Sequence, residues 1–234
     1  MKFTYLILNL FTFLPIIVFS FDKQLGFYRF WKYTLPGILG VYALFVIWDY
    51  YFTAWGVWQF NPAYVLDFRI LGLPIEEHFF FLFTPFACLF IYEALGVYVK
   101  PDFLSRLSKP IALILIILMG LVAVSFTDRM YTLVNFGFGA TVLLAAFIWM
   151  KKETLSLFWL AFLVHLVPFY IVNGILTSWP VLIYNDIENL GIRIGNIPLE
   201  DHAYSLILFL TNLWAYNWFK DKTFANASQA SSND

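Results

Sequence analysis

The sequence predicts an all-α integral membrane protein, a bundle of seven transmembrane helices, from three observations. The chain of 234 residues is 62% hydrophobic and 12% charged, about half the charged fraction of a soluble domain (about 25%). Seven apolar stretches are long enough, or nearly so, to cross a bilayer as helices at about 1.5 Å rise per residue. They are too long and unbroken for barrel strands, and lipid leaves only helices or closed barrels as spanning structures.

The predicted spans follow one another closely along the chain. Lys2 precedes the first stretch as in a signal peptide, but no small-residue cleavage site follows Phe19-Ser20-Phe21, so we expect a retained span. Only residues 127–129 separate the fourth span from the fifth, which makes this boundary the weakest. The seven spans are 3–20, 34–52, 75–96, 110–126, 130–150, 155–176 and 199–219.

The lysines and arginines divide unequally between the two sides of this bundle. One side has Lys23, Arg29, Lys32, Lys100, Arg106, Lys109, Lys151, Lys152, Lys220 and Lys222; the other has Lys2, Arg69, Arg129 and Arg193. Because the cytoplasmic side of a membrane protein carries the excess of these residues, we expect the N-terminus outside and the C-terminus inside the inner membrane. Residues 221–234 are polar and predict a disordered cytoplasmic tail.

A ten-residue segment occurs twice in the chain. Residues 69–78 (RILGLPIEEH) return 124 positions later as 193–202 (RIGNIPLEDH), and each copy runs into an apolar stretch. At the same offset Asp49 meets Asn173 and Tyr92 meets Tyr216. We therefore predict a parallel 3+1+3 repeat with a pseudo-twofold axis along the membrane normal. Its parts are 1–108, a connecting helix over 109–129, and 130–220.

Each copy of the segment places two acids after a proline: Glu76 and Glu77, then Glu200 and Asp201. Proline and acids at this position also suit an ordinary helix start, because acids favour the positive end of the helix dipole. A helix start does not need two acids with a histidine and an arginine beside them. Acids at a membrane helix are costly to keep, so the pattern favours a functional site shared by the two halves.

Aromatic rings are predicted one helical turn deeper than the acids. Phe80 follows Glu76 by four residues, and Tyr204 follows Glu200 by four, so each pair shares a helix face. This spacing also suits an ordinary core stripe. An acid above an aromatic face can stabilise a cation, and a carboxyl group kept from water favours its neutral form.

Further polar residues surround the motif. His78 and His202 are expected as proton shuttles or supporting residues. The chain lacks His-x-x-x-His spacing and has a single cysteine, Cys88, so we predict no metal site. The arginines that open the motif, Arg69 and Arg193, would favour an ionised acid nearby. Asp49 and its counterpart Asn173 differ by one charge and would break the symmetry of a shared cavity.

The pattern Pro-x-Glu-Glu/Asp, present twice in a small polytopic chain, resembles the lycopene cyclase domain family. The matching residues are Pro74, Glu76 and Glu77, then Pro198, Glu200 and Asp201, and the resemblance covers roughly residues 1–220. The chain is similar to the two-subunit bacterial form joined into one polypeptide. The resemblance implies lycopene or a related linear carotenoid as substrate, with membrane lipid and other carotenoid-biosynthesis enzymes as partners. It implies no redox change and no cofactor, and the chain has no Gly-x-Gly-x-x-Gly signal for a dinucleotide.

This resemblance implies an acid–base cyclisation through a carbocation, with β-carotene as the expected product. On this interpretation Glu76 and Glu200 are the principal catalytic pair, Glu77 and Asp201 come next, and Phe80 and Tyr204 stabilise the cation. The enzyme would be a non-redox isomerase or intramolecular lyase that excludes water from its pocket.

Other classes of protein remain as alternatives. A small transporter can share the parallel repeat, but it favours polar residues at mid-membrane, whereas here they gather at the outer ends. A retinal-binding protein needs a lysine within its last helix, and span 199–219 has none. A non-catalytic carotenoid-binding protein stays open. The net charge of −1 argues against a nucleic-acid partner.

Overall fold

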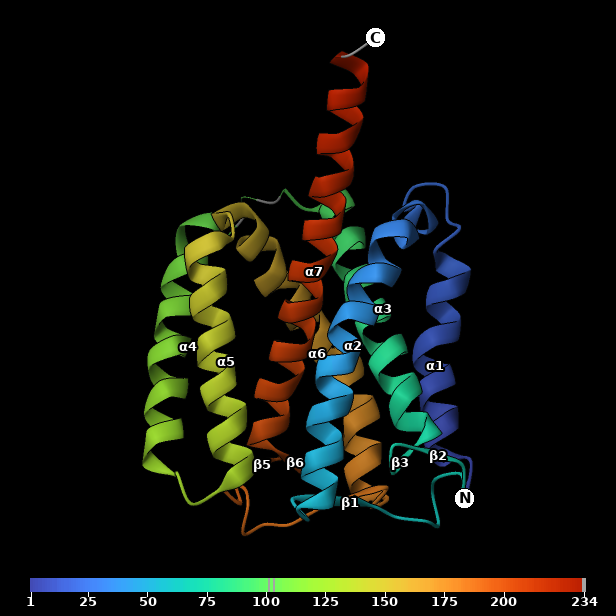
Figure 1. Cartoon of the computed structure of the whole chain (residues 1–234), viewed down its shortest axis with the longest axis vertical. Coiled ribbons are helices and arrows are strands. Elements are labelled where there is room, and N and C mark those ends of the chain that lie inside the picture. Colours follow the sequence, from blue (N-terminus) through green and yellow to red (C-terminus); the bar gives the residue numbers. More distant parts are fainter. Residues whose placement is uncertain (101, 103, 233–234) are drawn as a thin grey trace.

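A computed structural model describes residues 1–100, 102 and 104–232, with side chains as far as Lys222. The described part contains seven α-helices, and a short 3₁₀ helix, η1 (Phe27–Phe30), precedes the second (Figure 1). The prediction of an all-helical protein is therefore confirmed. The helices are α1 (Thr4–Phe19), α2 (Trp31–Ala54), α3 (Ile75–Tyr98), α4 (Ser105–Ser125), α5 (Met130–Trp149), α6 (Lys152–Ser178) and α7 (Leu199–Ser232).

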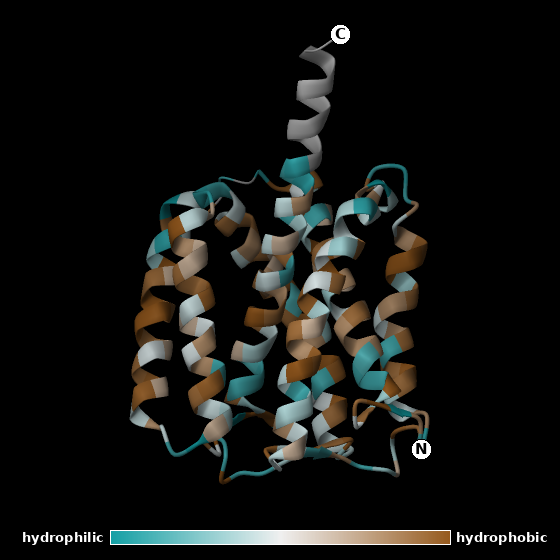
Figure 2. Cartoon of the chain, in the orientation of Figure 1, coloured by the Kyte–Doolittle hydropathy of each residue, from teal (hydrophilic) through white to brown (hydrophobic). Residues whose placement is uncertain are grey.

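Several of these helices have the length and composition of membrane spans. Among the described residues, the segment of η1 and α2 and helices α3, α4, α5 and α6 are each long and apolar enough to cross a bilayer, and α1 is a shorter apolar helix. Apolar residues dominate the middle of the bundle, and polar residues gather toward its two ends (Figure 2). The chain is thus a helical membrane protein. Its exact number of spans and the sides of its termini stay predictions.

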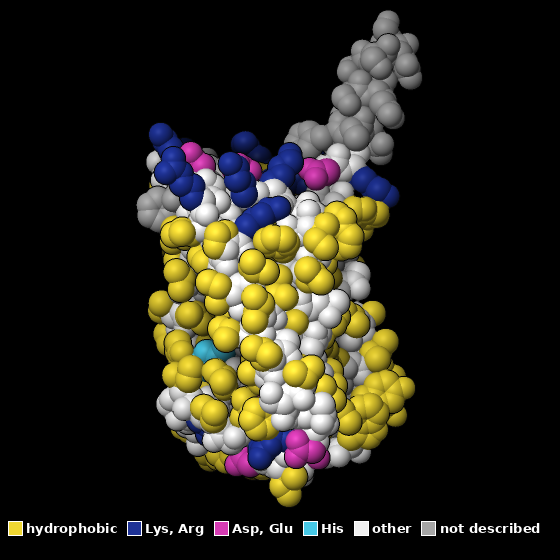
Figure 3. Space-filling view, turned by 90° about the vertical axis from the view of Figure 1, so that its left-hand side faces the viewer, with side chains coloured by type: hydrophobic (Ala, Val, Ile, Leu, Met, Phe, Trp, Pro, Cys, Tyr) yellow, Lys and Arg dark blue, Asp and Glu magenta, His cyan; other side chains and the backbone are white. Residues whose placement is uncertain are grey.

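The two ends of the bundle differ in charge. On the face drawn in Figure 3, lysine and arginine side chains crowd the end nearer the C-terminus, above a broad hydrophobic belt. The N-terminus lies at the opposite end, together with the short strands (Figure 1). This is the distribution from which the orientation is predicted.

The end of the chain differs from expectation. The sequence predicts a disordered tail over 221–234, whereas α7 continues as a helix to Ser232. Once a helix is nucleated, each added residue gains a backbone hydrogen bond, so the apolar part of α7 can extend into the polar segment. Residues 233–234 lie outside the described part of the chain.

The repeat extends to the short strands. Strands β1 (Trp58–Phe60), β2 (Arg69–Ile70) and β3 (Leu73–Pro74) recur 124 residues later as β4 (Leu182–Tyr184), β5 (Arg193–Ile194) and β6 (Ile197–Pro198). β2 and β3 form one hairpin, and β5 and β6 form the other. Each hairpin leads directly into the helix that carries the acids.

The pairing of β1 with β4 locates the symmetry between the halves. The two strands are antiparallel, and Gln59 lies opposite Ile183, its own repeat partner. Equivalent residues face one another in this way when a twofold axis passes between two antiparallel strands. The strand pair therefore marks the pseudo-twofold axis and joins the two repeats at one end of the bundle.

Helix packing follows the same plan. α1 packs on α3 as α5 packs on α7, and contacts of α2 with α7 and of α3 with α6 join the repeats. α4 lies against α5 and α6 (Figure 1). In the first and fifth helices the repeat offset is 126: Tyr5 and Asn9 make the contacts that Tyr131 and Asn135 make in the other half. The offset of 124 therefore does not extend to this pair of helices.

Gly37 marks the closest approach of α2 to α7. A Cβ atom built there would lie 3.1 Å from the backbone nitrogen of Tyr216, which is closer than side-chain carbons usually come to backbone. Only glycine fits without moving one of the helices, and this contact belongs to the interface between the two repeats.

We therefore expect Gly37→Val to separate α2 from α7 and to lower stability by about 1–3 kcal/mol, the usual cost of overpacking a core. Gly40→Val is the matched control on the same helix, because no atom lies within 4 Å of a Cβ at Gly40. Thermal unfolding in detergent measures both variants. Equal unfolding midpoints for the two variants would show that the close contact at Gly37 does not limit the stability of the protein.

Candidate active site

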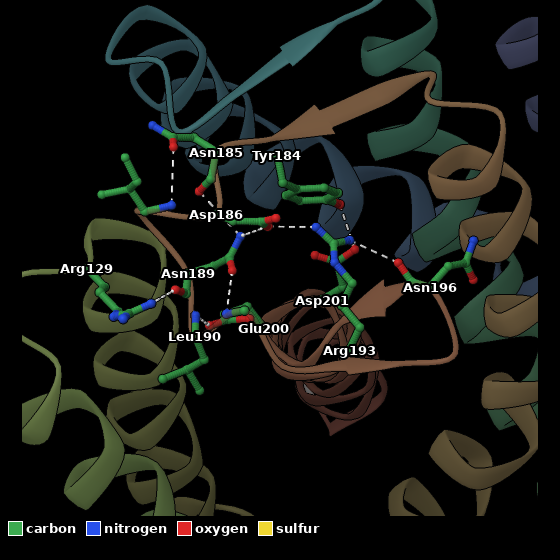
Figure 4. Close-up of polar contacts among 12 residues, drawn as sticks. Arg129, Tyr184, Asn185, Asp186, Asn189, Leu190, Arg193, Asn196, Glu200 and Asp201 are labelled. Atoms are coloured by element: carbon green, nitrogen blue, oxygen red, sulfur yellow. Dashed lines mark hydrogen bonds and ion pairs between the residues drawn. The ribbon is translucent and has the colours of Figure 1, made fainter.

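The first acid of each motif is tied to the loop before its helix. Glu76 and Glu200 are both fully buried (0% exposed). One carboxylate oxygen of each accepts a backbone N–H from ten residues earlier, from Leu66 and Leu190, at 2.8 Å in both cases. Figure 4 shows the bond between Leu190 and Glu200 in the second repeat. Thr132 also donates to Glu200, at 2.7 Å. These acids hold the loops against α3 and α7.

The second acid of each motif faces a cavity instead. Glu77 and Asp201 both line a cavity of about 110 Å³, to which Asp49 of α2 also contributes. This volume is somewhat below that of a cavity of about 150 Å³ that binds benzene in another protein, so it is of the order of a small hydrocarbon group. The cavity lies among α3, α6 and α7, and the β1–β4 pair covers it through Trp58, Leu182 and Tyr184. The sequence ranks Glu76 and Glu200 first, whereas the second acids are the ones that reach this cavity.

Asp201 is surrounded by hydrogen-bond donors. Tyr131 donates to one of its oxygens at 2.7 Å, and Tyr184 and Asn173 donate to the other at 2.6 Å and 2.7 Å. Burial raises the pKa of Tyr184 on β4 well above its usual range, so this phenol keeps its proton and remains a donor. Three donors around one carboxyl group form the environment of a carboxylate.

Glu77 and Asp49 form a different arrangement. Their side chains are within hydrogen-bonding contact of each other. Tyr5 donates to Glu77 at 2.6 Å, and Tyr204 donates to Asp49 at 2.9 Å. Two carboxylates in direct contact repel each other, so a hydrogen bond between two carboxyl groups requires a proton on one of them. The cavity therefore contains two carboxyl groups in contact with each other and a third that is surrounded by donors.

The rest of the cavity wall is largely apolar and aromatic. Phe80 and Tyr204, the two rings expected to stabilise a cation, both line it, together with Trp58 and Phe169. The Tyr204 ring lies edge-on to Trp48, with ring centres 5.4 Å apart. Such walls exclude water and present π faces to a ligand.

The predicted supporting histidines lie outside the cavity wall. His78 contacts the Tyr42 hydroxyl at 2.6 Å and the backbone carbonyl of Ile70 at 3.0 Å. His202 contacts the Tyr170 hydroxyl at 3.0 Å and the carbonyl of Pro198 at 3.1 Å. Both histidines join a hairpin to the helices, which is a positioning role rather than proton transfer at the cavity. No group of three or more potential metal ligands occurs in the described part of the chain.

The motif arginines stabilise the hairpins rather than the acids. Arg69 donates to the carbonyl of Gly72, and Arg193 donates to that of Asn196, both at 3.0 Å. Arg193 also forms an ion pair with Asp186 at 2.7 Å (Figure 4). A hydrogen bond from Asn189, together with Arg193, holds the pKa of Asp186 below its usual range. Neither arginine lines the cavity. The contacts described for these arginines do not include the motif acids, which they were expected to keep ionised.

Several polar residues of the cavity wall were not predicted as site residues, among them Tyr5, Tyr131, Tyr184 and His165. A signal existed for two of them, because Tyr-x-x-x-Asn occurs at Tyr5 and again at Tyr131, 126 residues later. His165 lies deeper on α6, where its Nδ1 approaches the Cys88 sulfur at 3.4 Å. A histidine within an apolar run could also have been singled out from the sequence.

Taken with the fold, these features describe a helical membrane protein in which two repeats jointly build a buried cluster of acids. A model of the lycopene cyclase family matches residues 2–95 and 128–219. The matched blocks contain the two repeats and leave out α4, and they begin 126 and end 124 residues apart, as the structural equivalences do. This chain belongs to the lycopene cyclase family. Comparisons with curated proteins and with solved structures give no match.

The loop contacts of Glu76 generate a prediction about stability. Glu76→Ala removes the acceptor of the Leu66 N–H, and leaving a buried donor unsatisfied costs about 1–3 kcal/mol. Glu76→Gln keeps an acceptor oxygen and should lose less. Thermal unfolding of both variants in detergent measures the difference, and an alanine variant as stable as the glutamine variant would contradict a fastening role.

Proposed function

We propose that this lycopene cyclase closes the linear ends of lycopene into β-ionone rings by acid–base chemistry without redox change. One observation carries the proposal: two carboxyl groups in contact, those of Asp49 and Glu77, line the same aromatic cavity as the donor-rich carboxyl group of Asp201. We take the contacting pair to share a proton. An acid, a base and a water-poor space between them are what such a cyclisation needs.

In the first step, the Asp49–Glu77 pair gives its proton to the terminal double bond of the polyene. The π electrons of that bond form the new C–H bond and leave a tertiary cation on the neighbouring carbon. The proton-sharing contact supplies an acid in its neutral form without requiring a low external pH. Tyr5 and Tyr204 each donate to this pair, so they stabilise the negative charge that remains after transfer.

In the second step, the next suitable double bond attacks the cation and closes a six-membered ring. The positive charge moves to a ring carbon, where the faces of Phe80 and Tyr204 can stabilise it. The same apolar walls keep away water, which would otherwise add to the cation and end the reaction as an alcohol.

In the last step, Asp201 accepts a proton from the carbon beside the cation, and the electrons of that C–H bond form the ring double bond. Loss of the proton that places this bond in conjugation with the polyene gives the β ring, the more stable alkene. One proton enters and one leaves, so the product is an isomer of the substrate. This scheme makes no use of a cofactor.

The protein is proposed to lie in the inner membrane as a multi-pass protein, with its N-terminus and the strand end of the bundle outside. The excess of lysine and arginine at the opposite end supports this orientation (Figure 3). A substrate dissolved in lipid would reach the cavity from the bilayer, where other enzymes of carotenoid synthesis would deliver it.

Paired glutamine variants test the assignment of the acids. Glu77→Gln breaks the acid pair that is proposed to donate the proton, so we expect cyclisation to fall by about 10²–10⁴-fold, the usual contribution of a catalytic acid. Glu76→Gln changes the neighbouring acid, which accepts a loop N–H with one oxygen and does not line the cavity, and should retain most of the activity. Product analysis by chromatography in lycopene-accumulating cells, normalised to protein level, gives both values. The opposite ranking would move the chemistry to Glu76.

The proton balance can be tested with purified protein and lycopene in buffer made with D₂O. Each ring closed should contain one deuterium from the solvent, because the exchangeable acid pair supplies the proton that stays in the ring. Mass spectrometry of the cyclic product counts the label. Rings without deuterium would rule out protonation by an exchangeable acid, and bound but unconverted lycopene would point to a carotenoid-binding protein.

A further inference from the structure

The cavity lies across the pseudo-twofold axis, because repeat partners such as Glu77 and Asp201 both line it. Away from the axis it extends to one side, where several of the residues that line it have no aromatic ring. Val172 and Leu176 of α6 line it, as does Thr12 of α1. Their repeat partners follow from the offsets described above. Val172 corresponds to Trp48, Leu176 to Phe52, and Thr12 to Phe138.

Each of these three partners is a large aromatic residue. The Trp48 ring contacts Phe52 and Phe138, with ring centres 5.5 Å apart in both cases, and contacts Tyr204 at 5.4 Å. Trp48 is 9% exposed and Phe52 is 3% exposed. These rings occupy the space among α2, α5 and α7 that corresponds by symmetry to the part of the cavity lined by Val172, Leu176 and Thr12.

The contacts of Trp48 indicate that its bulk is what matters at this position. Its indole nitrogen is buried and has no hydrogen-bond partner among the described residues. Leaving a buried donor unsatisfied costs free energy, so a residue retained for a hydrogen bond would have a partner there. Phe52 and Phe138 have no polar group to place. We call Trp48, Phe52 and Phe138 the aromatic plug.

All three cavity acids lie close to the axis. Asp49 comes from α2, Glu77 from α3 and Asp201 from α7, and each lines the one cavity although the two repeats supply them. The cavity is thus shared by the repeats, but it extends from the acids to one side only, because the plug fills the equivalent space on the other side.

We infer that the aromatic plug restricts this protein to one polyene end per binding event, an inference that rests on the proposed function. Lycopene is a long, stiff molecule with two equivalent ends, so one cavity can hold only one of them. A product with two rings then requires release of the one-ring intermediate, reversal and a second binding event. The plug residues are specificity residues, because they decide how many ends the protein can hold.

An isotope chase with purified protein in lipid vesicles tests this. The protein first acts briefly on ¹³C-labelled lycopene and then receives a large excess of unlabelled lycopene. We expect the label to remain in the one-ring product, while labelled two-ring product falls in proportion to the dilution. Conversion of labelled one-ring product to two-ring product despite the excess would overturn the inference. Absence of any cyclic product would instead overturn the proposed function.

A plug transferred to the open side provides an independent test. Val172→Trp places in the open cavity the residue that fills its counterpart, and we expect cyclisation to fall at least about 100-fold, as displacement of a substrate by an ångström can cause. Leu163→Trp is the matched control, because Leu163 lies on the same helix and is 58% exposed at the surface of the bundle. Thermal unfolding verifies that both variants fold. A folded Val172→Trp protein with normal cyclisation would overturn the assignment of this cavity as the single substrate site.

Discussion

A carboxyl group in the apolar interior of a helix bundle must be neutral or surrounded by donors, and the arrangement of this protein follows from that requirement. Five acids at the starts of α3 and α7 and the end of α2 are buried. They differ in their surroundings. One oxygen of Glu76 and of Glu200 accepts a loop N–H while the other has no partner among the described residues, Asp201 accepts from two tyrosines and an asparagine, and Asp49 contacts Glu77. The loops and the tyrosines of α1 and α5 donate hydrogen bonds to these acids, and the hairpins lead into the helices that carry four of them.

The two repeats have diverged at the positions where symmetry would be harmful to the proposed chemistry. Asp49 and Asn173 are equivalent, yet Asp49 contacts a second acid while Asn173 donates to one. A single change from acid to amide therefore separates a proton-sharing pair from a carboxylate rich in donors. The change from aliphatic residues on α6 to aromatic residues on α2 acts in the same direction, because it leaves the shared cavity open on one side of the axis and filled on the other.

The fold could be predicted from the sequence further than the site could. Long apolar runs give helices wherever lipid excludes other backbone structure, and the repeated motif identified the segment that carries the acids. The choice between Glu76 and Glu77 could not be predicted in this way, because adjacent residues at a helix start differ by about 100° around the axis. Which of them faces the cavity depends on how the hairpin enters the helix. The tyrosines that donate hydrogen bonds to the acids were also not predicted. Tyr5 and Tyr131 are 126 rather than 124 residues apart, and they lie on α1 and α5 rather than on the helices that carry the acids.

The strand pair β1–β4 has a consequence for how such a protein can be assembled. Its backbone hydrogen bonds join the two halves directly across the axis, whereas α4 connects them only as a tether that packs to one side. Halves encoded as separate polypeptides would therefore retain the means to recognise each other in the correct register. The acid pair, the carboxyl group opposite it and the open part of the cavity come together only when one half of each kind is present. A functional dimer of separate polypeptides would therefore need two unlike halves. Fusion into one chain would then mainly guarantee stoichiometry.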